Sequence, residues 1–219
     1  MIADPGAFIA RETRIERPPH CPEIALHLAS DAVPLWQATE EELGAMGLPP
    51  PFWAFAWAGG QALARYVLDH PGIVRAKRVL DFASGSGLVA IAAMQAGASA
   101  ALASDIDSFA IQAIGMNARL NGVAVTALDA DVIGRLDLGV DVVLIGDCAY
   151  ERDLAERVFV WARALEAAGV SVLIGDPGRS YLPRAALEPL ADYRIAVTRA
   201  LEDAEVKETR VWRLKRSEA

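Results

Sequence analysis

From Lys77 onward, the hydrophobic positions of the chain alternate between two spacings. Short apolar runs bounded by turn residues predict β-strands at residues 78–82, 100–104, 125–128, 140–145 and 170–174. Apolar positions at helical spacing predict helices that start near residue 87, include residues 111–118 and cover residues 152–167. Five strand–helix units in series are typical of a parallel, doubly wound α/β sheet. Two further β segments, at 193–199 and 208–214, bring the predicted strands to seven.

Residues 1–50 are irregular in composition, and we predict that they form an extension before a sheet domain of residues 51–219. A loose alternation at residues 23–29 predicts a short strand. A capping-box match at residues 39–42 predicts a short helix. The aromatic run at residues 52–57 leaves two interpretations open: it plugs the core, or it places one tryptophan beside a ligand.

Composition and charge limit the classes of function. At 219 residues and 23.4 kDa, the chain is long enough for one domain with a full core. A formal net charge of −8 argues against binding to a nucleic-acid backbone. Cys21 and Cys148 have no ligand-spaced companions, so we expect no disulfide framework and no metal site. No signal peptide and no membrane-spanning run is visible, so we expect a cytoplasmic location and no membrane contact.

The stretch 78–90 reads as a buried strand that ends on a carboxylate, followed by a glycine turn and the start of a helix. Gly85 and Gly87 lack a Cβ atom, so a ligand can lie against the backbone of this turn. The N–H groups that open the following helix point at the same space. The run Gly-Ser-Gly-Leu-Val-Ala also satisfies a dinucleotide-binding pattern, so the turn alone leaves the identity of the ligand open.

Five aspartates lie at or just beyond the carboxyl ends of the predicted strands: Asp81, Asp105, Asp131, Asp147 and Asp176. Ligands of doubly wound sheets bind at this edge. Asp105 follows Asp81 by 24 positions, the spacing of an acid that accepts hydrogen bonds from ribose hydroxyls. A second carboxylate at Asp81 would repel the two phosphates of NAD. The cationic sulfonium of S-adenosylmethionine fits such an acidic edge better.

Residues 81–87, Asp-Phe-Ala-Ser-Gly-Ser-Gly, resemble the first motif of class I, seven-stranded, S-adenosylmethionine methyltransferases, and residues 104–107 resemble the second. Three further stretches resemble protein-lysine methyltransferases with an Asp-x-x-Tyr-Asp/Glu motif after the fourth strand, namely residues 52–57, 117–123 and 146–151. With residues 176–183, the likeness is closest to the branch that methylates the β-subunit of electron-transfer flavoprotein, whose bacterial members are often labelled nicotinamide-methyltransferase-like.

The resemblance implies a site for S-adenosylmethionine made of Trp57, Asp81, Ala83, Ser84, Gly85, Asp105, Asp131 and Gly146. In this assignment Trp57 borders the methionine end of the cofactor, and Asp105 accepts from the ribose hydroxyls. Asp131 either accepts from the adenine amino group or serves only in a turn. Ala83 stands where the family has its first glycine, and we expect this change to tighten the turn without abolishing binding.

The resemblance also implies that Asp147 and Tyr150 are catalytic residues that face the incoming nucleophile. A free lysine has a pKa of about 10.4, so it must lose a proton before it can accept a methyl group. Asp147 can hold and orient the ammonium group, and Tyr150 offers a hydroxyl and a ring face for a cation. Cys148 lies between them in sequence, and we predict that it only packs.

The expected function is methyl transfer to a protein lysine, with the β-subunit of electron-transfer flavoprotein as the suspected substrate of a monomeric enzyme. The alternative is a small-molecule N-methyltransferase of the nicotinamide type. An NAD-binding module would need a second catalytic domain, for which 219 residues leave no room. A scaffold without turnover is disfavoured by the presence of Asp147 and Tyr150. Methyltransferases that act on nucleic-acid bases carry two prolines after the fourth strand, and residues 147–150 lack both.

Overall fold

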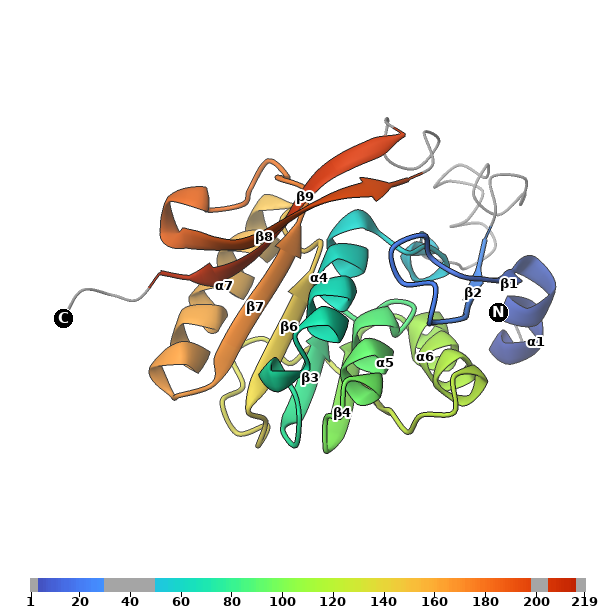
Figure 1. Cartoon of the computed structure of the whole chain (residues 1–219). Helices are drawn as coiled ribbons and strands as arrows, with labels where there is room; N and C mark the ends of the chain where they lie inside the picture. Colours follow the sequence, from blue (N-terminus) through green and yellow to red (C-terminus); the bar gives the residue numbers. More distant parts are fainter. Residues whose placement is uncertain (1–3, 30–49, 198–204, 216–219) are drawn as a thin grey trace.

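A seven-stranded sheet forms the centre of the computed structural model, which describes residues 4–29, 50–197 and 205–215. The spatial order of the strands is β5-β4-β3-β6-β7-β9-β8 (Figure 1). The first five strands in this order, β5, β4, β3, β6 and β7, are parallel to one another. Strand β9 runs antiparallel to both β7 and β8. Their bounds are β3 (Arg78–Phe82), β4 (Ala100–Asp105), β5 (Thr126–Asp129), β6 (Val142–Gly146), β7 (Ser171–Asp176), β8 (Leu187–Ala196) and β9 (Val206–Leu214). The predicted doubly wound, seven-stranded and mostly parallel sheet is confirmed.

Helices cover both faces of the sheet, which explains why β6 is apolar at every core position. The longer helices after residue 50 are α4 (Ala58–Asp69), α5 (Leu88–Gln95), α6 (Ser108–Leu120) and α7 (Arg152–Ala167). Val142 and Leu144 pack in the cluster that contains the buried residues of α4 and α5. Val143 and Ile145 point the other way and pack with α7. Within the described ranges, no helix has the length and apolar character needed to cross a membrane.

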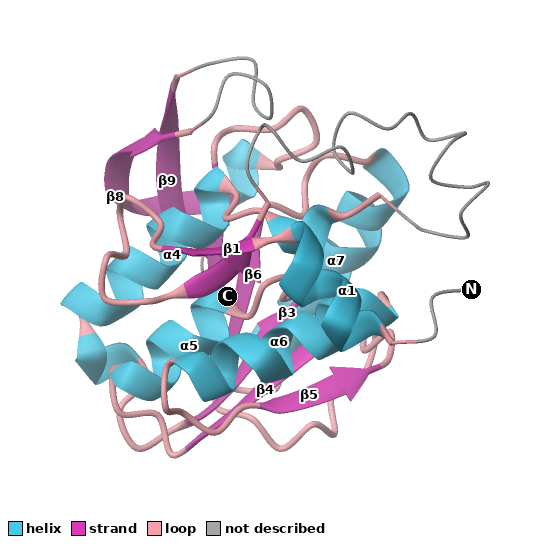
Figure 2. Cartoon of the chain, turned by 90° about the vertical axis from the view of Figure 1, so that its right-hand side faces the viewer, coloured by secondary structure: helices cyan, strands magenta, loops and turns pink. Residues whose placement is uncertain are grey.

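The described N-terminal residues pack on α6 (Figure 2). They form α1 (Pro5–Glu12) and an antiparallel pair of short strands, β1 (Arg14–Glu16) and β2 (Leu26–Leu28). The backbone N–H of Ala25 donates to Asn121 Oδ1 at 2.9 Å, and that of His27 donates to Asn117 Oδ1 at 2.8 Å. The short strand predicted at residues 23–29 is therefore confirmed. The capping-box helix predicted from residue 39 lies outside the described residues.

Two parts of the predicted strand–helix series are wrong. Among the described residues, no α-helix follows β5 or β7, because Gly134 and Gly139 adopt positive φ in one connection and proline and glycine interrupt the other. The short 3₁₀ helices are η1 (Phe52–Ala54), η2 (Pro71–Ile73) and η3 (Arg184–Ala186). Strand β8 begins at Leu187 rather than residue 193. It lies at the sheet edge, where Pro189 is tolerated beside a shift in register.

The first turn of α4 presses against the carboxyl ends of β6 and β7. A Cβ atom built on Gly59 would lie 2.3 Å from the carbonyl oxygen of Gly175, and one on Gly175 would lie 2.2 Å from the carbonyl oxygen of Gly59. A Cβ atom on Gly146 would lie 3.3 Å from the Cα atom of Gly60. The helix and the two strand ends therefore approach at a distance that the absence of these side chains permits.

We expect Gly59→Ala and Gly60→Ala to have opposite effects on stability. The methyl group at position 59 meets backbone and should lower the free energy of unfolding by about 1–3 kcal/mol through overpacking. A methyl group at position 60 meets nothing within 4 Å and should raise it by up to about 1 kcal/mol, as expected for replacing glycine in a helix. Urea denaturation of the two variants measures both effects. Equal effects would contradict the close approach.

Candidate active site

The turn between β3 and α5 is built from residues with left-handed backbone. Ala83 has φ +50° and Gly85 has φ +54°. The N–H of Ser84 donates to the carbonyl of Ser104 at 3.0 Å, and the N–H of Gly85 donates to Asp105 Oδ2 at 2.9 Å. The turn is thus tied to the end of β4. Alanine at position 83 keeps the left-handed conformation, at a steric cost of roughly 1–2 kcal/mol.

Asp81 lies beneath this turn and is 2% exposed. Its Oδ2 atom accepts hydrogen bonds from the Ser84 hydroxyl and from the backbone N–H of Ala90. Burial raises the pKa of Asp81 to about 7. The carboxyl group therefore shapes the turn from inside, whereas we expected it at the mouth of the site. Its assignment to the cofactor stays a prediction.

The acids at the ends of β4 and β5 divide into two groups. Asp105 is half-buried, and its Oδ1 atom accepts from the N–H of Asp107 at 3.0 Å. Asp129 is its register partner across the two strands. Asp131, by contrast, accepts from the N–H of Ile133 and forms an ion pair of 2.7 Å with Arg157 of α7.

For Asp131, the turn interpretation is the one that the structure displays, and the adenine assignment stays a prediction. Sequence reasoning missed Asp129. The signal available in the sequence was its place directly after the predicted strand 125–128; the structure adds that it is level with Asp105 on the neighbouring strand.

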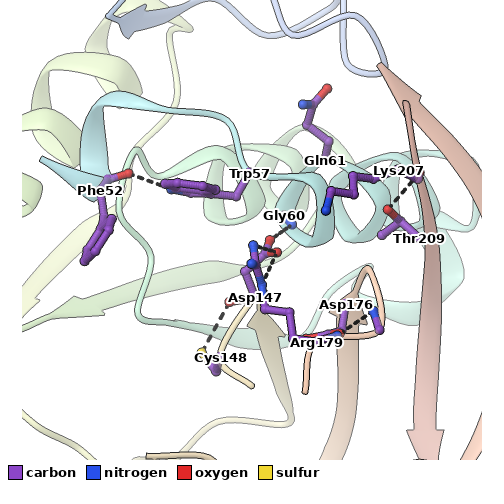
Figure 3. Close-up of polar contacts among 12 residues, drawn as sticks. Phe52, Trp57, Gly60, Gln61, Asp147, Cys148, Asp176, Arg179, Lys207 and Thr209 are labelled. Atoms are coloured by element: carbon purple, nitrogen blue, oxygen red, sulfur yellow. Dashed lines mark hydrogen bonds and ion pairs between the residues drawn. The ribbon is translucent and has the colours of Figure 1, made fainter. Parts of the chain in front are cut away.

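Asp147 follows β6 and has φ +55°. Its side chain is 10% exposed. The Oδ2 atom accepts from the backbone N–H of Gly60 at 2.8 Å, and the Oδ1 atom accepts two hydrogen bonds from Arg179, at 2.7 and 3.2 Å (Figure 3). Burial raises the pKa of Asp147, against the opposing effect of Arg179. The predicted ammonium-binding carboxylate is therefore already paired with a cation of this chain.

Sequence reasoning did not single out Arg179, although the stretch 176–183 carried part of the family resemblance. Oδ1 of Asp176 accepts from the N–H groups of Gly178 and Arg179, at 2.6 and 2.7 Å, and so fixes the loop after β7. The guanidinium of Arg179 lies 5.8 Å from the centre of the Trp57 ring. Arg179 is thus held between a carboxylate and an indole face.

The aromatic run 52–57 divides between the core and the site: the core interpretation is confirmed for two of its rings, and the contact of a tryptophan with a ligand stays a prediction. Trp53 and Phe55 are buried in a core cluster with Phe109. Trp57 lies at the site, and its Nε1–H donates to the carbonyl of Phe52 at 2.9 Å. The Phe52 ring lies 6.0 Å from that of Trp57 and 6.2 Å from that of Tyr150.

Tyr150 is 52% exposed, and its partial burial raises the pKa of its hydroxyl. Together with Phe52 and Trp57 it forms the aromatic rim of the site. The structure therefore brings Trp57, Asp147 and Tyr150 to one place, as the sequence predicted.

The remaining residues at the end of β6 have packing roles. Cys148 is 4% exposed, belongs to the core cluster with α7 and donates to the carbonyl of Gly146, as the predicted packing role requires. Burial raises the pKa of its thiol. Gly146 lies against Gly60, and its assignment to the cofactor stays a prediction. In the described part of the chain, no group of three acidic, histidine or cysteine residues is arranged to hold a metal ion.

The fold and the site together define a class of protein. A seven-stranded sheet with one reversed strand, a glycine turn after β3 and an acid at the end of β4 are the features of a class I methyltransferase. A solved structure of a putative methyltransferase, SMU.776 complexed with SAH, shares this fold. It has a TM-score of 0.51 and 10% identity, and the match covers 72% of this chain and 50% of that one.

Sequence comparisons identify the family. The model of the ribosomal protein L11 methyltransferase family matches residues 62–145. The electron transfer flavoprotein beta subunit lysine methyltransferase of Xenopus laevis is 38% identical over 214 residues, which cover 95% of this chain and 86% of the relative. Its namesake from Mus musculus is 38% identical over 197 residues, covering 87% and 76%. The chain belongs to the family of electron transfer flavoprotein beta subunit lysine methyltransferases.

The buried carboxyl of Asp81 should make stability depend on pH. Its folded pKa of about 7 is higher than that of an unfolded aspartate, about 3.9, so its contribution is complete below pH 4 and is lost as the pH rises to 7. Asp81→Asn does not titrate. We therefore expect the unfolding free energy of Asp81→Asn, relative to the native chain, to rise between pH 4 and 7, as measured by chemical denaturation.

Asp137→Asn is the matched control: Arg135 lowers the pKa of this exposed carboxylate, so its contribution changes only below about pH 4 and its difference from the native chain should be flat from pH 4 to 7. A flat difference between Asp81→Asn and the native chain from pH 4 to 7 would show that Asp81 is ionised throughout.

Proposed function

We propose that this chain transfers the methyl group of S-adenosylmethionine to a lysine amine of the β-subunit of electron-transfer flavoprotein. Membership of the family supports the substrate, since the relatives carry that activity in their names. One observation from the structure carries the proposal. The glycine turn with Asp105 and the cluster of Trp57, Asp147 and Tyr150 lie at the same edge of the sheet, at the carboxyl ends of neighbouring strands.

The residues at the ends of β3 and β4 suit S-adenosylmethionine. Asp105 offers carboxylate oxygens, which only accept hydrogen bonds and therefore match ribose hydroxyls. The residues from Ala83 to Gly85 are exposed or half-buried, and the N–H of Gly85 donates to Asp105. When bound, S-adenosylmethionine supplies an electrophilic methyl group on a sulfonium, with S-adenosylhomocysteine as the product. Asp129, level with Asp105, is a second acceptor on this edge.

The acceptor lysine must present a neutral amine. At pH 7 the ammonium form exceeds the amine by roughly a thousandfold, because the pKa of lysine is about 10.4. Once a proton has passed to water, the nitrogen lone pair forms the new N–C bond while the C–S bond breaks, and the product is a methylated ammonium. Trp57 and Tyr150 offer ring faces that align the acceptor, and Asp147 fixes the end of β6 beneath them.

The exposure of the rim favours a protein over a small molecule as acceptor. Tyr150 is 52% exposed and Phe52 is 47% exposed, so among the described residues these two rings face solvent at the mouth of the site. A nicotinamide-sized acceptor is typically enclosed on most of its surface. Aromatic side chains on an open rim are typical of surfaces that contact a protein. We also propose a monomeric, cytoplasmic enzyme that does not bind nucleic acid, in line with the net charge of −8.

The direct test of the proposed function uses purified electron-transfer flavoprotein and labelled S-adenosylmethionine. We expect label on the β-subunit alone, assigned to lysine by peptide mass spectrometry. Nicotinamide and mixed RNA are offered in parallel reactions. Rapid methylation of nicotinamide with an unlabelled β-subunit would replace the proposal by the small-molecule alternative.

The test of the cofactor site is a comparison of Asp105→Ala with Asp131→Ala. Loss of the Asp105 carboxylate removes a charge-assisted acceptor and should weaken S-adenosylmethionine binding by about 1.5–3 kcal/mol. Asp131 is already engaged by Arg157, so its removal should weaken binding less. Isothermal titration calorimetry measures both affinities. An unchanged affinity in Asp105→Ala would refute the ribose assignment, and an equal loss in Asp131→Ala would favour its adenine role.

A further inference from the structure

We propose that Arg179 is a positioning residue for the acceptor amine: its guanidinium keeps the Asp147 carboxylate engaged, so that the amine enters a site with no free negative counter-charge. This inference rests on the proposed function, because it requires an amine acceptor that is protonated in water. It assigns a role to a side chain of the loop after β7.

The Asp147 carboxylate is engaged on both oxygens. Oδ1 accepts from two nitrogen atoms of Arg179, and Oδ2 accepts from the backbone N–H of Gly60. A Cβ atom on Gly59 would lie 2.6 Å from Oδ2, so the first turn of α4 also closes over the carboxylate. With the side chain 10% exposed, an incoming ammonium has little access to it. The direct role predicted for Asp147, holding the ammonium, would require this pair to open.

Arg179 is held independently of Asp147. Its backbone N–H donates to Asp176 Oδ1, and its guanidinium lies against the Trp57 ring (Figure 3). The side chain is 21% exposed and therefore largely buried between these partners. Arginine suits this task better than lysine, because its planar fork donates two hydrogen bonds to one carboxylate and remains charged.

The charge balance at the site explains why the pair matters. A free carboxylate stabilises an ammonium and raises its pKa, whereas a nearby cation stabilises the neutral amine, which is the reactive form. The negative charge of Asp147 and the positive charge of Arg179 cancel in this ion pair. Among the described residues, the other charged or titratable groups near the pair include Asp176 of β7, Cys148, Tyr150 and Glu151 after β6, Asp81 of β3, Asp105 of β4 and Arg184 of η3. Figure 3 also draws Lys207 of β9.

The competing interpretation is that Arg179 is a plug, which the target ammonium displaces from Asp147 and Trp57. The two interpretations predict opposite effects of removing Arg179 on the reaction rate. If Arg179 positions and balances, its removal slows the reaction at neutral pH. If Arg179 is a plug, its removal makes Asp147 available and speeds the reaction.

The experiment measures kcat against pH, which reports the pKa of the amine in the enzyme–substrate complex, for the native chain, Arg179→Gln, Asp147→Asn and the double variant. The β-subunit is the acceptor, and folding is checked by thermal melting. Without the guanidinium, Asp147 faces the amine alone, so the rising limb should move to higher pH by about one to two units. At pH 7 this is a loss of about tenfold to a hundredfold. In Asp147→Asn, which lacks the carboxylate, the rising limb of the pH profile should move to lower pH, even if the maximal rate also falls. In the double variant the two shifts should cancel.

Arg152→Gln is the matched control. Arg152 also lies over an aromatic ring, that of Tyr181 at 5.2 Å, so the variant removes one positive charge without touching Asp147. The rising limb of the pH profile of Arg152→Gln should not move. If Arg179→Gln fails to fold, the shift to lower pH in Asp147→Asn still tests the sign, and Arg179→Lys tests whether a point charge suffices.

An unmoved rising limb of kcat in the folded Arg179→Gln and Asp147→Asn variants, or a higher kcat for Arg179→Gln at pH 7, overturns the inference. If the native chain does not methylate the β-subunit, the proposed function fails. The same pH series is then run on whichever lysine-bearing protein the native chain methylates, so the two failures are distinguishable.

Discussion

The site depends on the contact between the first turn of α4 and the ends of β6 and β7. Backbone meets backbone there, since a single methyl group on Gly59 or Gly175 would lie within 2.3 Å of a carbonyl oxygen. The contact brings the N–H of Gly60 to Asp147 and carries Trp57, the residue that caps the helix, to the same edge. The strand order decides which strand ends are neighbours. The close contact of α4 with these ends decides which side chains lie over them. A helix shifted outward by one side-chain layer would leave Asp147 open to water.

Two buried aspartates of this edge show how environment separates the roles of one residue type. Burial raises the pKa of both Asp81 and Asp147. Asp81 is met by a hydroxyl and a backbone N–H, which tolerate a neutral carboxyl, and it supports the turn that faces the cofactor. Asp147 is met by a guanidinium, which favours the charged form. The first aspartate is therefore part of the scaffold, and the second is part of the electrostatics of the site.

Much of this architecture could be read from the sequence because apolar runs mark buried strands whatever their partners. The strand at Arg78–Phe82 and the helix at Arg152–Ala167 have the predicted bounds. The Asp147–Arg179 pair could not be read in the same way. It joins two loops 32 positions apart, and it needs the left-handed backbone of Asp147. Asp129 was missed because strand register, which sets it beside Asp105, is a property of paired strands.

Two asparagines of α6, Asn117 and Asn121, bind the N-terminal segment. This segment is synthesised first but can complete its packing only after α6 exists. Ala25 is joined to Asn121 across 96 positions of sequence. At roughly 5–20 residues per second, translation must continue for about 5–20 s after Ala25 before its partner exists. During this interval β2 can pair with β1, but the backbone N–H groups of Ala25 and His27 lack the asparagine side chains to which they donate. The first described segment to leave the ribosome therefore docks only after α6 has been made, so the start of the chain completes its packing later than its place in the sequence suggests.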